Sequence, residues 1–162
     1  MDQARSGMVE HCRGTKSTVR VATEADIPAM HLVRLAVREN RLSDPDRLTP
    51  DDYAAAIGPL GRGWVAESGG QLAGFAVGYY SGNIWALFVH PQHEGRGCGK
   101  VLHDTMVSWL WQQGLRQLWL TTDPGTRAEA FYRSRGWRPC STLPGHGLRL
   151  ELDLTTTQWI PS

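Results

Sequence analysis

The sequence predicts one α/β sandwich domain, in which a mixed sheet of about seven strands carries helices on both faces. Three observations predict it. The chain has 162 residues, the size of a single domain. Its apolar residues alternate with period two in several short segments and recur with a helical period in others. Glycine and proline separate these segments, in the order strand, two helices, three strands, helix, strand, helix and two strands.

The N-terminal segment is polar and aperiodic, so we expect residues 1–17 to be a disordered tail and residues 18–162 to form the domain. Alternating valines predict a first strand over 18–22. Asp26 is a candidate N-cap for the next helix, whose apolar stripe should end near Asn40.

A second helix is expected over 49–57, because Thr49, Pro50 and Asp52 form a cap, a first-turn proline and an acidic third position. Two strands joined by the Gly69–Gly70 turn follow it, and a further turn leads into a central apolar strand over 84–89.

The central helix should end at Gly114, before a strand over 116–122 and a helix over 126–135. A strand over 137–143 contains Pro139, which suits a sheet edge or a bulge. Leucines alternate with charged residues over 148–154 and predict a half-buried final strand, paired through the turn at 144–147.

Composition excludes several classes of function. A net charge of +1 does not favour nucleic-acid binding, and the lack of a long apolar stretch does not favour a membrane protein. We therefore expect a cytoplasmic protein. The three cysteines, Cys12, Cys98 and Cys140, are widely spaced and should be reduced thiols, and no histidine spacing indicates a metal site.

Three alternating glycines, Gly95, Gly97 and Gly99, lie between the central strand and the central helix. Unpaired N–H groups and the dipole at a helix start attract phosphate, and glycines let the backbone approach it closely. The nucleotide loop G-x-x-x-x-G-K-S/T fails at Glu94, and the dinucleotide loop G-x-G-x-x-G fails at Lys100.

The run V-H-P-Q-H-E-G-R-G-C-G-K-V-L resembles the pyrophosphate-binding motif Q/R-x-x-G-x-G/A of the GNAT superfamily of acyl-CoA-dependent N-acyltransferases. It departs from that motif at Glu94, where Gln or Arg is usual, and the loop acts mainly through backbone N–H groups. The resemblance implies that acetyl-CoA is bound, as co-substrate and without a metal, by Leu87, Phe88, Val89, Glu94, Gly95, Arg96, Gly97, Cys98, Gly99 and Lys100.

The segment A-E-A-F-Y-R-S-R-G-W resembles a second GNAT motif, A-x-x-L/F-Y-x-x-x-G-F/W, whose tyrosine lies near the thioester sulfur. This makes Tyr132 the candidate general acid, which protonates the thiolate expelled when an amine attacks the thioester. The alternative is that Tyr132 only packs. Gly125 stands where the family often has asparagine.

The resemblance also implies that the central strand splays from the strand after it, beside the pantetheine arm, with a backbone N–H near Phe88 polarising the thioester carbonyl. The general base is unassigned, because Asp123 is equally explained as a turn residue. Cys98 is a candidate nucleophile at a helix start, but its place in an apolar stripe favours a buried hydrophobe. Arg96 and Lys100 are candidate phosphate partners, or a solvated pair.

The acceptor site is expected around 38–52 and at Tyr79 and Tyr80. Aspartates in that segment could attract a cationic amine, although helix capping alone explains two of them. Among the seven tryptophans, Trp109, Trp119 and Trp137 follow core-facing patterns.

The leading hypothesis is an N-acetyltransferase that moves an acetyl group to a primary amine by direct attack in a ternary complex. The acceptor could be a small molecule or a peptide, no nucleic acid or membrane partner is expected, and a homodimer is left open. The alternatives are a CoA-binding or regulatory module without catalysis and a nucleotide-binding phosphate loop.

Overall fold

The computed structural model describes residues 17–42, 44–143 and 147–154. Of the tail expected at 1–17 only Ser17 is described, and it belongs to the first strand; most of the turn expected at 144–147 also lies outside the described residues. The elements occur in the predicted order. The strands are β1 (Ser17–Val21), β2 (Gly61–Ser68), β3 (Gln71–Tyr79), β4 (Ile84–Val89), β5 (Gln117–Thr122), β6 (Arg138–Leu143) and β7 (Gly147–Asp153). The helices are α2 (Ile27–Ala36), α3 (Pro50–Ala56), α4 (Cys98–Gln112) and α5 (Arg127–Ser134), with 3₁₀ turns η1 (Glu24–Asp26), η2 (Pro45–Arg47) and η3 (Pro91–His93).

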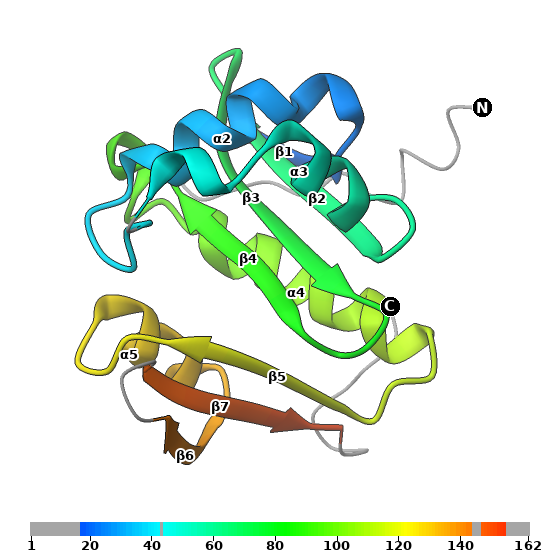
Figure 1. Ribbon diagram of the computed structural model, residues 1–162, viewed down its shortest axis with the longest axis vertical. Helices are drawn as coiled ribbons and strands as arrows, with labels where there is room; N and C mark the ends of the chain where they lie inside the picture. Colours follow the sequence, from blue (N-terminus) through cyan, green and yellow to red (C-terminus); the bar gives the residue numbers. More distant parts are fainter. Residues whose placement is uncertain (1–16, 43, 144–146, 155–162) are drawn as a thin grey trace.

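The strands form two hydrogen-bonded segments, an antiparallel β1-β2-β3-β4 and an antiparallel β5-β7-β6. A single parallel bridge between Asn83 and Trp119 joins them, where the Trp119 N–H donates to the Gly82 carbonyl at 2.9 Å. Beyond this bridge β4 and β5 run in the same direction and separate toward α5 (Figure 1). The mixed sheet is thus as predicted, and so is its opening between β4 and the strand after it.

A β-bulge lies in β4 at the same junction. Val77 pairs with Ala86 and Gly78 pairs with Ile84, which leaves Trp85 as an extra residue. The extra residue shifts the alternation of side chains, so that Ile84 joins the core on one face of the sheet and Ala86 the core on the other.

Helices cover both faces of the sheet, with α2 and α3 in front and α4 behind in the view of Figure 1. On the α4 side Leu102, Met106 and Leu110 are fully buried in a helical stripe. Trp137 is buried as predicted, whereas Trp119 is only half-buried. The prediction failed for Trp119 because its neighbours Leu118 and Leu120 occupy the core face of β5.

The ends of α2 agree only in part with the prediction. Asp26 is the N-cap residue of α2, as predicted, but its carboxylate makes no cap hydrogen bond to α2 and instead accepts from the Thr23 N–H at 2.8 Å, across a 3₁₀ turn. At the other end, α2 stops at Ala36 and Asn40 adopts a left-handed conformation with φ of 55°. The helix stops early because residues 37–40 turn toward the end of β5.

Other local predictions hold. Thr49 and Asp52 form a capping box at the start of α3. Pro139 lies in an edge strand, next to a register shift. No helix among the described residues has the length and apolar character needed to cross a membrane.

Candidate active site

A cavity of about 550 Å³ lies where β4, the glycine loop and α5 meet, and we call it the large cavity. Its lining includes nine of the ten residues predicted to bind acetyl-CoA, all except Arg96, and also Tyr132, the predicted general acid. The lining consists of Val37, Arg38, Glu39, Asn40, Leu87, Phe88, Val89, His93, Glu94, Gly95, Gly97, Cys98, Gly99, Lys100, Arg127, Ala128, Phe131 and Tyr132.

The glycine loop presents backbone to this cavity. Gly95 and Gly97 have φ values of 78° and 86°, in the left-handed region that favours glycine. A Cβ atom at Gly95 would meet nothing within 4 Å, so the space beside it is open. α4 begins directly after Gly97, and the N–H groups of its first turn have no acceptor within the helix. The arrangement is therefore suited to a bound anion.

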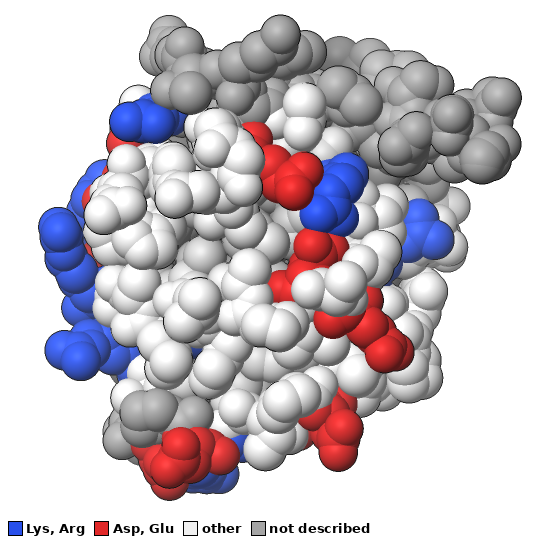
Figure 2. All heavy atoms as spheres, turned by 90° about the horizontal axis from the view of Figure 1, so that it is seen from above, with Lys and Arg blue, Asp and Glu red and all other residues white. Residues whose placement is uncertain are grey.

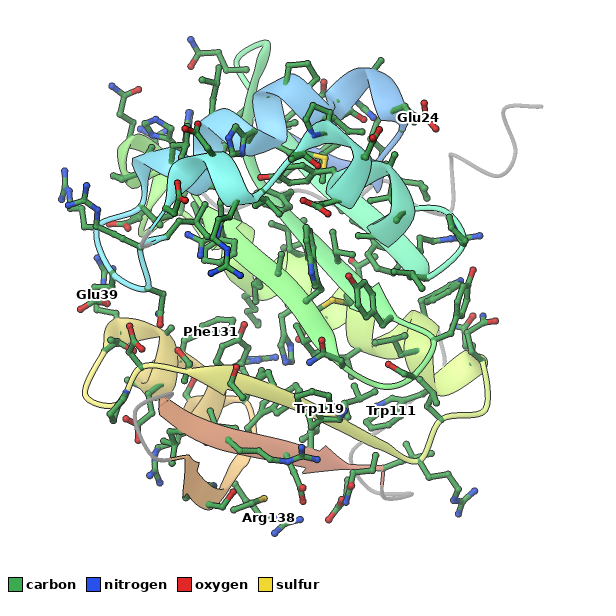
Figure 3. All side chains as sticks on the ribbon, in the orientation of Figure 1. Glu24, Glu39, Trp111, Trp119, Phe131 and Arg138 are labelled. Atoms are coloured by element: carbon green, nitrogen blue, oxygen red, sulfur yellow. The ribbon has the colours of Figure 1, made fainter. Side chains whose placement is uncertain are left out.

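The unusual residue of the loop, Glu94, pairs with α5. Its Oε1 accepts from Arg127 Nη1 at 2.8 Å, and the Arg127 backbone N–H donates to Glu39 Oε1 at 2.8 Å. Glu39 thus reaches from the loop after α2 to the start of α5 (Figure 3). The acidic departure from the motif is balanced by a cation from another element.

Tyr132 lies deeper in the cavity, with 6% of its surface exposed. Its ring is in edge contact with Phe131 and Trp137, at centroid distances of 5.4 Å. Burial raises the pKa of the Tyr132 phenol well above its usual value of 10, so it keeps its proton at neutral pH.

A buried hydrogen-bond chain supports the wall behind Tyr132. Trp137 Nε1 donates to His103 Nε2 at 2.9 Å, and His103 Nδ1 lies 2.9 Å from Asp104 Oδ1. An indole nitrogen can only donate, so His103 Nε2 must be unprotonated and Nδ1 must carry the hydrogen. Burial acts to raise the pKa of Asp104, but the His103 hydrogen bond and the charge of Arg135 outweigh it and lower that pKa.

A second cavity, of about 310 Å³, continues from the first, and we call it the small cavity. The two share Asn40, Leu87, Phe88, Ala128 and Tyr132, so they meet at the tyrosine. The remaining lining residues of the small cavity are Arg34, Arg41, Ile84, Trp85, Ala86, Leu120, Thr121, Thr122 and Asp123.

Part of the segment 38–52 expected at the acceptor site lines the two cavities, namely residues 38–41. Tyr79 stacks on Trp85 and Tyr80 packs on Trp109, and neither tyrosine lines the large or the small cavity. The aspartates at 44, 46, 51 and 52 line neither cavity; Asp44 caps a 3₁₀ turn and Asp52 the start of α3, which confirms the capping explanation for Asp52. Among the described residues, no group of three or more His, Cys, Asp or Glu side chains could hold a metal ion.

The contacts of several lining residues could not be predicted from the sequence. His93 is only 9% exposed although it lies in a turn, and its burial, with the nearby Arg96, lowers its pKa. Glu39 and Asn40 reach partners more than 80 positions away, the Arg127 and Asp123 N–H groups. No local pattern signals such contacts. Cys98, at 2% exposed, is buried in the apolar core as expected.

A sequence model of the acetyltransferase (GNAT) family matches residues 29–137, well over half of the chain. The chain belongs to the GNAT family. The resemblance of the two motifs to the GNAT family is thereby confirmed. An uncharacterized ycf52-like N-acetyltransferase of Prochlorococcus marinus is 37% identical over 54 residues, a match that spans 33% of this chain and 29% of that protein.

Solved structures show the same GNAT fold. The PaiA N-acetyltransferase of Thermoplasma acidophilum, solved with coenzyme A, superposes with a TM-score of 0.74 at 13% identity, covering 86% of this chain and 99% of the other. The ribosomal-protein-S18-alanine N-acetyltransferase of Escherichia coli gives 0.69 at 17% identity, covering 86% and 95%. At these identities the likeness concerns the fold alone.

Proposed function

We propose that this GNAT protein transfers an acetyl group from acetyl-CoA to a primary amine by direct attack, with both substrates bound together. The observation that carries the proposal is the meeting of the two cavities at Tyr132. The large cavity receives acetyl-CoA and the small cavity receives the amine. No covalent enzyme intermediate is then needed, because amine and thioester can lie on either side of one side chain.

The large cavity fits the donor. Its open space beside Gly95 and the first turn of α4 suit the pyrophosphate, and Lys100 adds a cation. Leu87, Phe88 and Val89 offer the edge of β4 to the pantetheine arm where β5 has moved away. Acetyl-CoA supplies the acetyl group and a thiolate as leaving group.

Two groups assist the transfer. A backbone N–H near Phe88 donates a hydrogen bond to the thioester oxygen as the amine nitrogen forms its bond to the carbonyl carbon. Tyr132 donates its hydroxyl proton to the departing sulfur as the carbon–sulfur bond breaks. The amine releases one proton through the small cavity, which Tyr132 and Asp123 both line, and Tyr132 regains one proton from solvent by the same route, so that the enzyme returns to its starting state.

Purified protein tests the proposal in two steps. Acetyl-CoA should raise the melting temperature, whereas ATP and NAD should not, which separates a CoA site from a nucleotide loop. A panel of primary amines should then release free thiol from acetyl-CoA, with the acetylated amine detected by mass spectrometry. Binding of acetyl-CoA without turnover of any amine would instead indicate a CoA-binding module that lacks catalysis.

A further inference from the structure

The small cavity has a cationic wall formed by Arg34. This residue comes from α2, and its guanidinium carbon lies 4.2 Å from the centroid of the Phe88 ring. Its Nη1 atom is buried and has no hydrogen-bond partner within the part of the chain that the structure describes. A buried arginine in a fold of this kind usually has its donors satisfied by a carboxylate, a carbonyl or a phosphate.

A buried Nη1 group without a hydrogen-bond partner is unfavourable. Burial lowers the pKa of Arg34, partly offset by Tyr53, which means that the site disfavours the charge it holds. Arginine nevertheless stays protonated, so the missing solvation must come from an anion or an acceptor group. An anionic ligand in the small cavity would supply it.

The charged residues of the lining come from two different elements, with the basic ones on α2 and its loop and the acidic one after β5. Arg41 lines the same cavity, so the two cations follow each other along α2 and its loop. Asp123 is the acidic residue of the lining and comes from the end of β5, on the other side of the opening. Basic side chains also run along the left edge of the molecule in Figure 2, the side on which α2 and β4 end in Figure 1.

Two hydrogen bonds cross the opening between β4 and β5 beside this cavity. Asn40 Oδ1 accepts from the Asp123 N–H at 2.8 Å, and Glu39 accepts from the start of α5. These contacts tie the loop after α2 to the C-terminal half across the opening between β4 and β5. A volume of about 310 Å³ beside these contacts suits a small molecule better than an extended chain.

We propose that the acceptor is a small amine that also carries a carboxylate, of the amino-acid class. Arg34, with Arg41, binds the carboxylate, and the amine faces Asp123 and Tyr132. This inference rests on the proposed acetyl transfer and specifies its acceptor. The two ends of such a molecule match the two signs of charge in the lining.

The test compares free amino acids with their primary amides, which keep the amine and lose the carboxylate. We expect the preferred amino acid to exceed its amide in kcat/KM by about 10- to 100-fold, the range for a charge-assisted hydrogen bond. Arg34→Gln should reduce this ratio to near one, and Arg34→Lys should retain part of it. The KM for acetyl-CoA should stay unchanged in both variants, which also shows that they fold.

Arg62→Gln is the matched control, because Arg62 also lies over an aromatic ring, 4.6 Å from the Trp109 centroid, but lines neither cavity. It should keep the wild-type ratio. Equal use of acid and amide by the wild type, an unchanged ratio in Arg34→Gln, or turnover of peptides but not of free amino acids would each overturn the inference. If no amine releases thiol, the proposed function itself fails.

Discussion

Replacing Tyr132 by phenylalanine removes one hydroxyl and leaves the ring. The edge contacts with Phe131 and Trp137 depend on the ring alone, so the free energy of unfolding should change by about 1 kcal/mol or less. The proton for the leaving thiolate is lost. We expect kcat to fall by about 10²- to 10⁴-fold, the usual contribution of a general acid. This equals roughly 3 to 6 kcal/mol of transition-state stabilisation at about 1.4 kcal/mol per tenfold.

The assay is thiol release at saturating acetyl-CoA and amine, accompanied by a thermal shift with acetyl-CoA. Tyr53→Phe is the control, since Tyr53 is 1% exposed, lines neither cavity, and has a pKa that burial raises to about 12. It should lose about 1 kcal/mol of stability with its 2.8 Å contact to His31 Nδ1, and keep its turnover. A Tyr132→Phe protein that binds acetyl-CoA and turns over within about threefold of wild type would refute the acid role.

Three further outcomes are expected. Gly95→Ala should raise the KM for acetyl-CoA by tenfold or more, because the added Cβ enters the proposed anion site. Gly70→Ala is the control, since Gly70 has a φ of 80° and equally open space beside it. Both substitutions should lower the free energy of unfolding by about 1 kcal/mol, but Gly70→Ala should leave the KM unchanged. Asp26→Asn should flatten the acid limb of a pH–stability curve. Burial acts to raise the pKa of the Asp26 carboxyl group, but its hydrogen bonds with Arg20 outweigh burial and lower that pKa below 3.8. The stabilisation that Asp26 contributes is therefore complete above pH 3.8 and is lost as the pH falls through the folded-state pKa. Trp137→Phe should lower the free energy of unfolding by about 1 to 3 kcal/mol in urea, because His103 Nε2 is left buried without its donor. An unchanged urea midpoint for Trp137→Phe would contradict the role of Trp137, and an unchanged pH–stability curve for Asp26→Asn would contradict the role of Asp26.

The two motifs that resemble those of the GNAT family, the glycine loop and the segment that contains Tyr132, could be predicted from the sequence because each depends on residues a few positions apart. The glycine loop is defined by backbone conformations at Gly95 and Gly97 and by the helix start that follows. The capping box at Thr49 and the alternating leucines of β7 likewise depend on residues a few positions apart. Such signals suffice for the order of elements and for the donor side of the site.

The lining of the small cavity could not be predicted from the sequence. Arg34 follows the buried Val33 in α2, and nothing in that spacing tells whether its guanidinium meets solvent, a partner or a cavity. The loop after α2 was expected to contribute aspartates, but it is Asn40 and Arg41 that reach the cavity.

The sequence by itself therefore determined the class of fold, the order of its elements and the place of the anion-binding loop. Only the tertiary structure decided how the opening between β4 and β5 is lined and that Glu94 pairs with Arg127. It also decided that Arg34 lines the small cavity and that its Nη1 atom has no hydrogen-bond partner among the described residues. The physical reason is the range of the interactions. Backbone conformation and helix capping act between neighbours in sequence, whereas cavities and ion pairs depend on how distant elements pack.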